Sequence, residues 1–87
     1  MNRHLKILSL DYNSLGDRGA SALAAALEEN TRLEGLDLEG NQISDVGAEA
    51  LLEAMKHNGR LEDITLMPGN DIRETTLTAI KEQLAAR

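Results

Sequence analysis

The chain has 87 residues and a net charge of −6 at neutral pH, with no cysteine, tryptophan or phenylalanine and a single tyrosine. This length fits one small domain with an aliphatic core, and the absence of cysteine excludes disulfides and thiolate metal sites. The negative charge disfavours nucleic acid and anionic membranes as partners. No apolar run approaches the roughly 18 residues of a membrane span, and because Met1 to His4 lead directly into patterned sequence, we expect no signal peptide.

Two hydrophobic periods alternate along the chain. Where apolar and polar residues alternate, the pattern predicts strands, at about 7–11, 35–39 and 63–67. Where the apolar spacing is near 3.6, it predicts helices, at about 17–29, 45–57 and 74–86. Asp17 and Asp45 lie at the expected helix starts, where the helix dipole favours acids, and Ser44 is the expected N-cap of the second helix. Asn30 and Asn58-Gly59 follow the first two helices, where a left-handed residue commonly ends a helix.

The three strand–helix units repeat one another. Leu8, Leu36 and Ile64 follow one another at intervals of 28 residues, whereas the third asparagine of the series Asn13, Asn41 and Asn70 comes one residue late. One residue is therefore inserted near Met67-Pro68-Gly69. We interpret the chain as one domain of three repeats, at about 2–29, 30–57 and 58–87.

These residues resemble the leucine-rich repeat family, whose pattern L-x-x-L-x-L-x-x-N-x-L stands here as Leu5 to Leu15 and as Leu33 to Ile43. The chain is most similar to the ribonuclease-inhibitor-like subclass, because Gly19-Ala20 and Gly47-Ala48 match its glycine-alanine helix start, which the third copy lacks. The resemblance implies an α/β leucine-rich repeat solenoid, a fragment of a right-handed α/β horseshoe with a parallel sheet on its concave side and helices outside. It also implies that Asn13, Asn41 and Asn70 point inward and hydrogen-bond main-chain groups of neighbouring turns.

The two ends of the array differ. Pro68 in the third repeat removes a strand donor, which suits an edge, and the last helix is more polar than the alanine-rich first helix. We therefore expect the C-terminal part of a longer array. The alternative is that the uncapped N-terminal edge is covered by self-association, with small residues of the first helix accepting the neighbour: Ala22, Ala24, Ala25 and Ala26.

The residues suited to catalysis or to metal binding are few. His4 precedes the first strand, and His57 ends the second helix, where the helix dipole explains a histidine. Asp37-x-Glu39-x-Asn41 resembles the start of a calcium loop, but Gln42 replaces the glycine needed at position six. We expect no enzyme, no cofactor and no metal.

A binding surface is the remaining hypothesis. Side chains between the core leucines are expected on the concave side of the sheet, with neighbouring strands about 4.8 Å apart. Asp11, Asp37 and Glu39 would form a negative stripe that suits a basic protein partner; the alternative is that they only keep the sheet soluble. Ile7, Gly35 and Gly40 are expected on the same side. The candidate partner-binding residues are Ser9, Asp11, Tyr12, Asp37, Glu39, Asp63, Thr65 and Met67.

The expected function is that of a protein–protein interaction module in the cytoplasm. The absence of cysteine is compatible with that reducing compartment. The resemblance extends to the repeats of NOD-like receptors, nuclease inhibitors and Ran GTPase-activating proteins. Two alternatives stay open: a partner-binding segment of a GTPase activator or enzyme inhibitor, and a structural cap that closes a longer solenoid.

Overall fold

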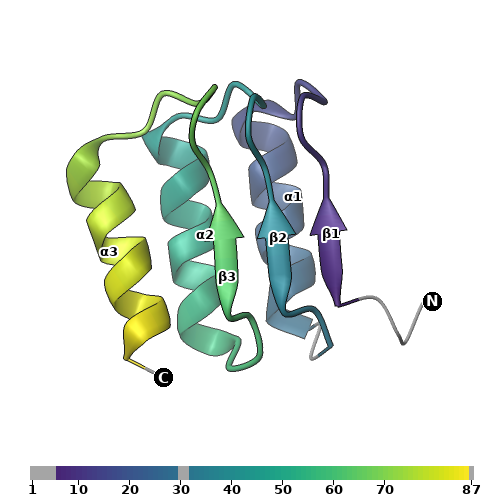
Figure 1. Ribbon diagram of the computed structural model, residues 1–87, viewed down its shortest axis with the longest axis vertical. Helices are drawn as coiled ribbons and strands as arrows, with labels where there is room; N and C mark the ends of the chain where they lie inside the picture. The colour runs from purple at the N-terminus through teal and green to yellow at the C-terminus, as the bar shows by residue number, and fades with distance from the viewer. Residues whose placement is uncertain (1–5, 30–31, 87) are drawn as a thin grey trace.

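Strands and helices alternate along the chain in a computed structural model that describes residues 6–29 and 32–86 (Figure 1). The elements are β1 (Ile7–Ser9), α1 (Gly16–Glu29), β2 (Gly35–Asp37), α2 (Asp45–His57), β3 (Asp63–Thr65) and α3 (Glu74–Ala85). The predicted order of strands and helices is confirmed. Asn30 and His4 lie outside the described residues.

The three strands form one parallel sheet in the order β1-β2-β3. Leu8 lies beside Leu36, and Leu36 beside Ile64, so the 28-residue period is the register of the sheet. Each strand has three residues rather than the five predicted. The chain nevertheless stays paired beyond the strands, because the N–H groups of Leu10 and Leu38 donate to the carbonyls of Asp37 (2.9 Å) and Thr65 (2.8 Å).

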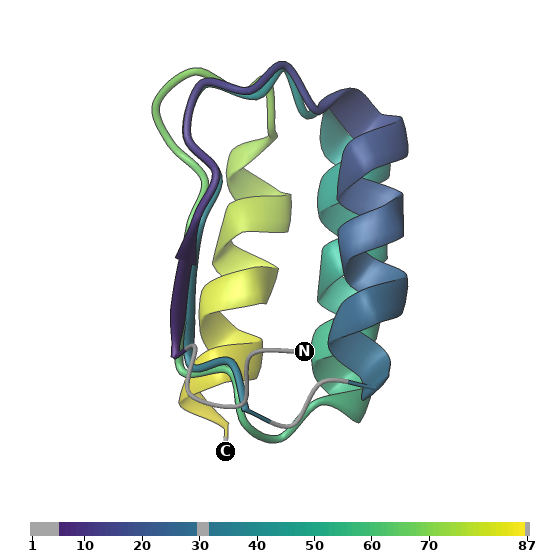
Figure 2. The ribbon, with the colours of Figure 1, turned by 90° about the vertical axis from the view of Figure 1, so that its right-hand side faces the viewer.

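All three helices lie on one side of the sheet, and the other side is uncovered (Figure 2). The core fills the space between sheet and helices, and it is deepest in the middle unit. Leu36 of β2 is buried, whereas Leu8 and Ile64 at the same position in the outer units are only half-buried. Figure 2 also shows α3 nearer the sheet than α1 and α2.

Buried asparagines connect the turns that follow the strands. The Oδ1 atom of Asn41 accepts hydrogen bonds from the N–H groups of Asn13 (2.9 Å) and Leu15 (3.3 Å) in the preceding unit. Its Nδ2 atom donates to the carbonyl of Leu10 (2.9 Å). Asn70 repeats the arrangement one unit later, accepting from Asn41 (3.1 Å) and Ile43 (2.8 Å). The inward position predicted for these two asparagines is confirmed.

The same prediction is wrong for Asn13. Its side chain is exposed, and its Nδ2 atom donates to the carbonyls of Leu10 (2.8 Å) and Asp11 (3.1 Å) within its own turn. The reason is directional: each asparagine serves the unit before it, and no unit precedes Asn13 in the described part of the chain.

Acidic residues at the helix starts also act across units. Asp17 at the start of α1 accepts from the N–H of Ser44 (2.7 Å), the hydroxyl of Ser44 (2.6 Å) and the N–H of Gly47 (2.9 Å), all at the start of α2. Asp45 in turn accepts from the N–H of Arg73 (2.7 Å), just before α3. The predicted N-cap is confirmed, because the hydroxyl of Ser44 accepts from the N–H of Val46 (3.3 Å). The hydrogen bonds from Ser44 lower the pKa of Asp17.

The asparagine contacts predict unequal costs of substitution at Asn41 and Asn13. Asn41→Leu should lower the free energy of unfolding by on the order of 1–3 kcal/mol, because it leaves buried main-chain N–H and carbonyl groups without partners. Asn13→Leu should cost clearly less, since the side chain is exposed and bonds only its own turn. Urea unfolding of both variants measures the difference, and equal losses would contradict the directional arrangement.

The hydrogen bonds to Asp17 predict an acid-sensitive part of the stability. A carboxylate whose pKa is lowered by folding contributes its full stability above the ordinary aspartate pKa of about 3.9, and this contribution is lost as the pH falls through the lower, folded value. The difference in unfolding free energy between wild type and Asp17→Ala should therefore be largest at neutral pH and shrink in acid. Asp63→Ala is the control, because that exposed carboxylate accepts no hydrogen bond in the described part of the chain. If the difference in unfolding free energy between wild type and Asp63→Ala changed with pH in the same way, the explanation would fail.

Candidate functional site

The candidate site is the uncovered face of the sheet, here called the open face. The strand register arranges its side chains in rows across the three strands, because side chains of a strand alternate between its two faces. The first row is Ile7, Gly35 and Asp63, and the second is Ser9, Asp37 and Thr65. Asp11, Glu39 and Met67 follow two residues further along each chain segment, so the structure places the predicted residues on neighbouring segments.

The carboxylates of the open face are not equivalent. Asp11 is half-buried; its Oδ1 atom accepts from the N–H of Glu39 (2.9 Å), and the hydroxyl of Ser9 donates to Oδ2 (3.4 Å). Asp11, predicted as a residue of the negative stripe, is therefore also part of the fold. Asp37, Glu39 and Asp63 have no hydrogen-bonded side chain among the described residues, which leaves their carboxylates available to a ligand.

A shallow hollow of about 340 Å³ lies at the end of the open face where the strands begin. Gly35 keeps it open, because a Cβ atom there would come within 3.2 Å of the Ile7 side chain. Ile7 is 63% exposed and supplies an apolar wall. Asp37 and Asp63 were predicted at this face. The two further acids of the lining, Glu34 and Glu62, come just before the strands, where no alternating pattern identified them.

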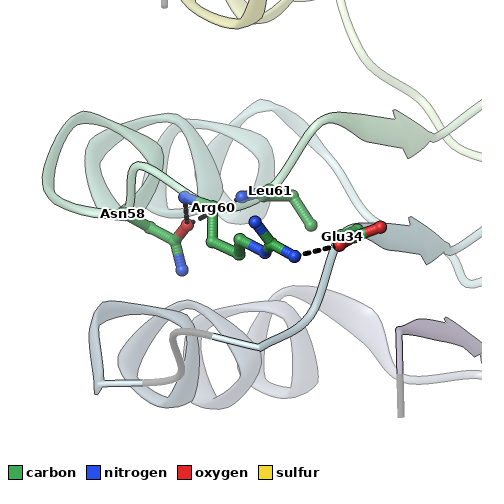
Figure 3. A network of polar contacts seen from close by, with 4 residues as sticks. All are labelled: Glu34, Asn58, Arg60 and Leu61. Atoms are coloured by element: carbon green, nitrogen blue, oxygen red, sulfur yellow. Dashed lines mark hydrogen bonds and ion pairs between the residues drawn. The ribbon is translucent and has the colours of Figure 1, made fainter. Parts of the chain in front are cut away.

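A polar network holds the turn beside this hollow (Figure 3). Asn58, which follows α2, is buried, and its Oδ1 atom accepts from the N–H groups of Arg60 (2.7 Å) and Leu61 (2.9 Å). Its Nδ2 atom donates to the carbonyl of Leu27 at 2.6 Å. The expectation of a left-handed helix end at Asn58-Gly59 is wrong: the backbone of Asn58 is extended, with φ −113°, and Gly59 does not have a positive φ. The Arg60 guanidinium forms an ion pair with Glu34, so the negative charge of Glu34 at the edge of the hollow is neutralised.

Tyr12 lies at the opposite end of the open face. Its side chain is 72% exposed, and its φ of 60° is unusual for a bulky residue and stores strain. The ring packs on Gly40, where a Cβ atom would come within 2.2 Å of the ring, so only glycine fits beneath it. Met67, another predicted partner-binding residue, is 42% exposed. Both side chains flank the acidic residues.

The described residues contain no group of three or more histidine and acidic side chains that could hold a metal ion. His57 is exposed, with its Nε2 atom 3.4 Å from Glu53, on the helix side of the molecule. The Oδ1 atom of Asn41 already accepts two N–H groups, so the calcium-like sequence around it is occupied by the turn. No helix in the described part is long and apolar enough to cross a membrane.

Solved structures share this fold. The tropomodulin C-terminal domain from Caenorhabditis elegans matches with a TM-score of 0.82 at 18% identity, over 97% of this chain and 50% of that one. Leiomodin-1 Actin-Binding Site 2 matches with a TM-score of 0.78 at 23% identity, over 94% of this chain and 48% of that one. The chain thus spans about half the length of these structures, and at such identities the likeness is one of fold.

Sequence comparison supplies the family. No curated protein matches the chain. The sequence model described as Leucine Rich repeat matches residues 2–24 and 29–52, which together are more than half of the chain. These residues span the first unit and most of the second, where the strands, turns and helices described above repeat. The chain therefore belongs to the leucine-rich repeat family.

Proposed function

We propose that this chain is a protein–protein interaction module, without enzymatic activity, that binds its partner through the open face of the sheet. One observation carries the proposal: parallel sheets are normally covered on both faces, but here the helices cover only one (Figure 2). The uncovered face presents side chains in regular rows on a rigid sheet. A face of this kind, open and pre-organised, favours binding with little cost of reorganisation.

The charges of the open face favour a basic partner. Asp37, Glu39 and Asp63 have free carboxylates, and Glu62 adds a fourth beside the hollow. Arg60 is paired with Glu34 and offsets none of these four, whereas Lys6, exposed just before β1, leaves one positive charge at this margin. Opposite charge on a partner would steer its approach and set its orientation. Exposed apolar side chains at the margins, Ile7, Tyr12 and Met67, supply anchoring area.

The structural neighbours support a protein as the ligand class. The leiomodin-1 segment is named for an actin-binding site, and it shares the strand and helix arrangement of this chain at 23% identity. A repeat array of this shape therefore occurs in a segment that binds a protein. We infer the charge of the partner from the acids of this chain's open face alone: Asp37, Glu39, Glu62 and Asp63.

We also propose a subclass, a location and a place in a longer array for this chain. The 28-residue period and the two glycine-alanine helix starts support the ribonuclease-inhibitor-like subclass, with repeats similar to those of NOD-like receptors, and a segment of a horseshoe solenoid. A cytoplasmic location agrees with the absence of cysteine. The exposed small residues of α1 at the uncapped N-terminal edge, Ala22, Ala25 and Ala26, support either the C-terminal part of a longer array or self-association. The runner-up roles are a partner-binding segment of a GTPase activator or enzyme inhibitor, and a structural cap.

A charge reversal on the open face tests the proposed surface. The double variant Asp37→Lys with Glu39→Lys should bind a lysine- and arginine-rich probe peptide at least about tenfold more weakly than wild type, because two attractions become repulsions. The melting temperature should change little, since neither carboxylate bonds to the described part of the chain. Fluorescence anisotropy with the peptide, and with an acidic peptide of equal length, measures binding and its sign.

The matched control changes the same charge elsewhere. Glu28→Lys with Glu29→Lys alters two exposed acids at the end of α1, on the helix side of the molecule. This variant should keep most of the peptide binding. Equal loss in both double variants would show that only net charge matters, and unchanged binding in the first would remove the open face as the binding surface.

A further inference from the structure

The middle unit shows how two units of this chain pack together. Positions that face the preceding unit are fully buried there, as Asn41 and Ala54 illustrate. The equivalent residues of the first unit, Asn13 and Ala26, are exposed. The first unit thus carries a complete set of interface positions, together with a small hollow between β1 and α1 lined by Leu8, Leu23, Ala26, Leu27, Leu33 and Leu36. We call this surface the N-terminal edge.

The other end of the stack has main-chain donors without acceptors. In each internal contact, one asparagine Oδ1 atom accepts two N–H groups of the unit before it. The N–H groups of Asn70 and Ile72 occupy the same places in the third unit, and neither has a partner among the described residues. The N–H of Leu66, whose equivalent in the second unit donates to β3, is likewise unpaired there.

A groove beside Leu66 is lined by residues of β3 and α3, two elements that lie next to each other in Figure 1. Its volume is about 500 Å³, and its lining is mainly apolar, with Glu74 and Lys81 at the charged margin. Ile64, Leu77 and Leu84 are half-buried here, where their equivalents in the middle unit are buried. Glu74 is third in the series that begins with Asp17 and Asp45, and unlike them it accepts no hydrogen bond from a described residue. We call this surface the C-terminal edge.

We propose that the C-terminal edge binds the N-terminal edge of a second copy of this chain, so that copies stack head to tail. In this contact β1 of the second copy extends the sheet beside β3, which gives the unpaired edge of β3 a partner. The Oδ1 atom of Asn13 in the second copy accepts hydrogen bonds from the N–H groups of Asn70 and Ile72 in the first copy. Glu74 of the first copy then lies near the N-terminus of α1 in the second copy, where a negative charge is favourable.

The fit is specific because both edges belong to the same contact. The strand part of this contact occurs twice in the structure, between β1 and β2 and between β2 and β3, at the same register. The N-terminal edge supplies the acceptor and the small helix residue of the contact, and the C-terminal edge supplies the donors, the groove and the acid. A second copy thus matches apolar, hydrogen-bonding and charged groups at once. Because stacking lengthens the open face without covering it, this inference is independent of the proposed binding function.

Head-to-tail stacking is tested by disabling each edge separately. The N-edge variant is Asn13→Ala with Ala26→Arg, which removes the acceptor and places a large side chain where Ala54 is fully buried in the internal contact. The C-edge variant is Glu74→Arg with Lys81→Trp, which reverses the charge and fills the groove. All four positions are exposed, so circular dichroism should show folded proteins. Sedimentation velocity from micromolar to millimolar concentration measures the species.

Wild-type chains should form dimers and longer assemblies as concentration rises, because a head-to-tail contact does not close. Each variant alone should be monomeric, and an equimolar mixture should form a one-to-one dimer and nothing larger, since one intact edge of each kind remains. A monomeric wild type at millimolar concentration would overturn the proposal. So would a dimer of the N-edge variant alone, which would show two C-terminal edges facing each other, or a mixture that stays monomeric.

Discussion

The fold depends on satisfying main-chain groups in the turns that follow the strands. Once strands lie side by side, the inner main-chain groups of these turns are shielded from water, and each one left without a partner is costly. Asn41 and Asn70 solve the problem, because one amide both accepts two N–H groups and donates to two carbonyls. An aliphatic residue of similar size could fill the space but could make none of these bonds, which explains an amide in an otherwise aliphatic core.

Because each asparagine serves the unit before it, the stack has a direction. Asp17 and Asp45 act in the opposite sense, reaching from one helix start to the next. Each internal contact is thus bonded in both directions by side chains of both units. The ends of the stack are therefore chemically different: the first unit has an exposed asparagine, and the last has unused donors and an unused acid. The same interactions that stabilise the middle unit make the two edges complementary.

Much of the fold could be predicted from the sequence, because the spacing of the apolar residues follows from how the units pack. The 28-residue spacing of Leu8, Leu36 and Ile64 is the strand register itself, and Asn41 had to turn inward once the strands were side by side. What the sequence could not show were bonds between units made by residues outside the apolar pattern. Asp17 at a helix start is explained by the dipole alone, so its bonds to Ser44 and Gly47 were not expected. Asn58 follows a helix like many C-terminal caps, yet its amide bonds Leu27 of the first unit.

Sequence patterns also do not distinguish the acids of the open face that bond to the fold from those that do not. Asp11 and Asp37 are both aspartates beside core leucines, and the alternating pattern treats them alike. Only the structure shows that Asp11 accepts the N–H of Glu39 across the strands, whereas Asp37 accepts nothing from the described residues. A carboxylate committed to a main-chain donor cannot be exchanged without disturbing the next unit, but a free one can change with the partner. The leucines, the buried asparagines and Asp11 therefore define the fold, whereas the carboxylates of Asp37, Glu39, Glu62 and Asp63 bond to none of the described residues and remain available for the proposed recognition.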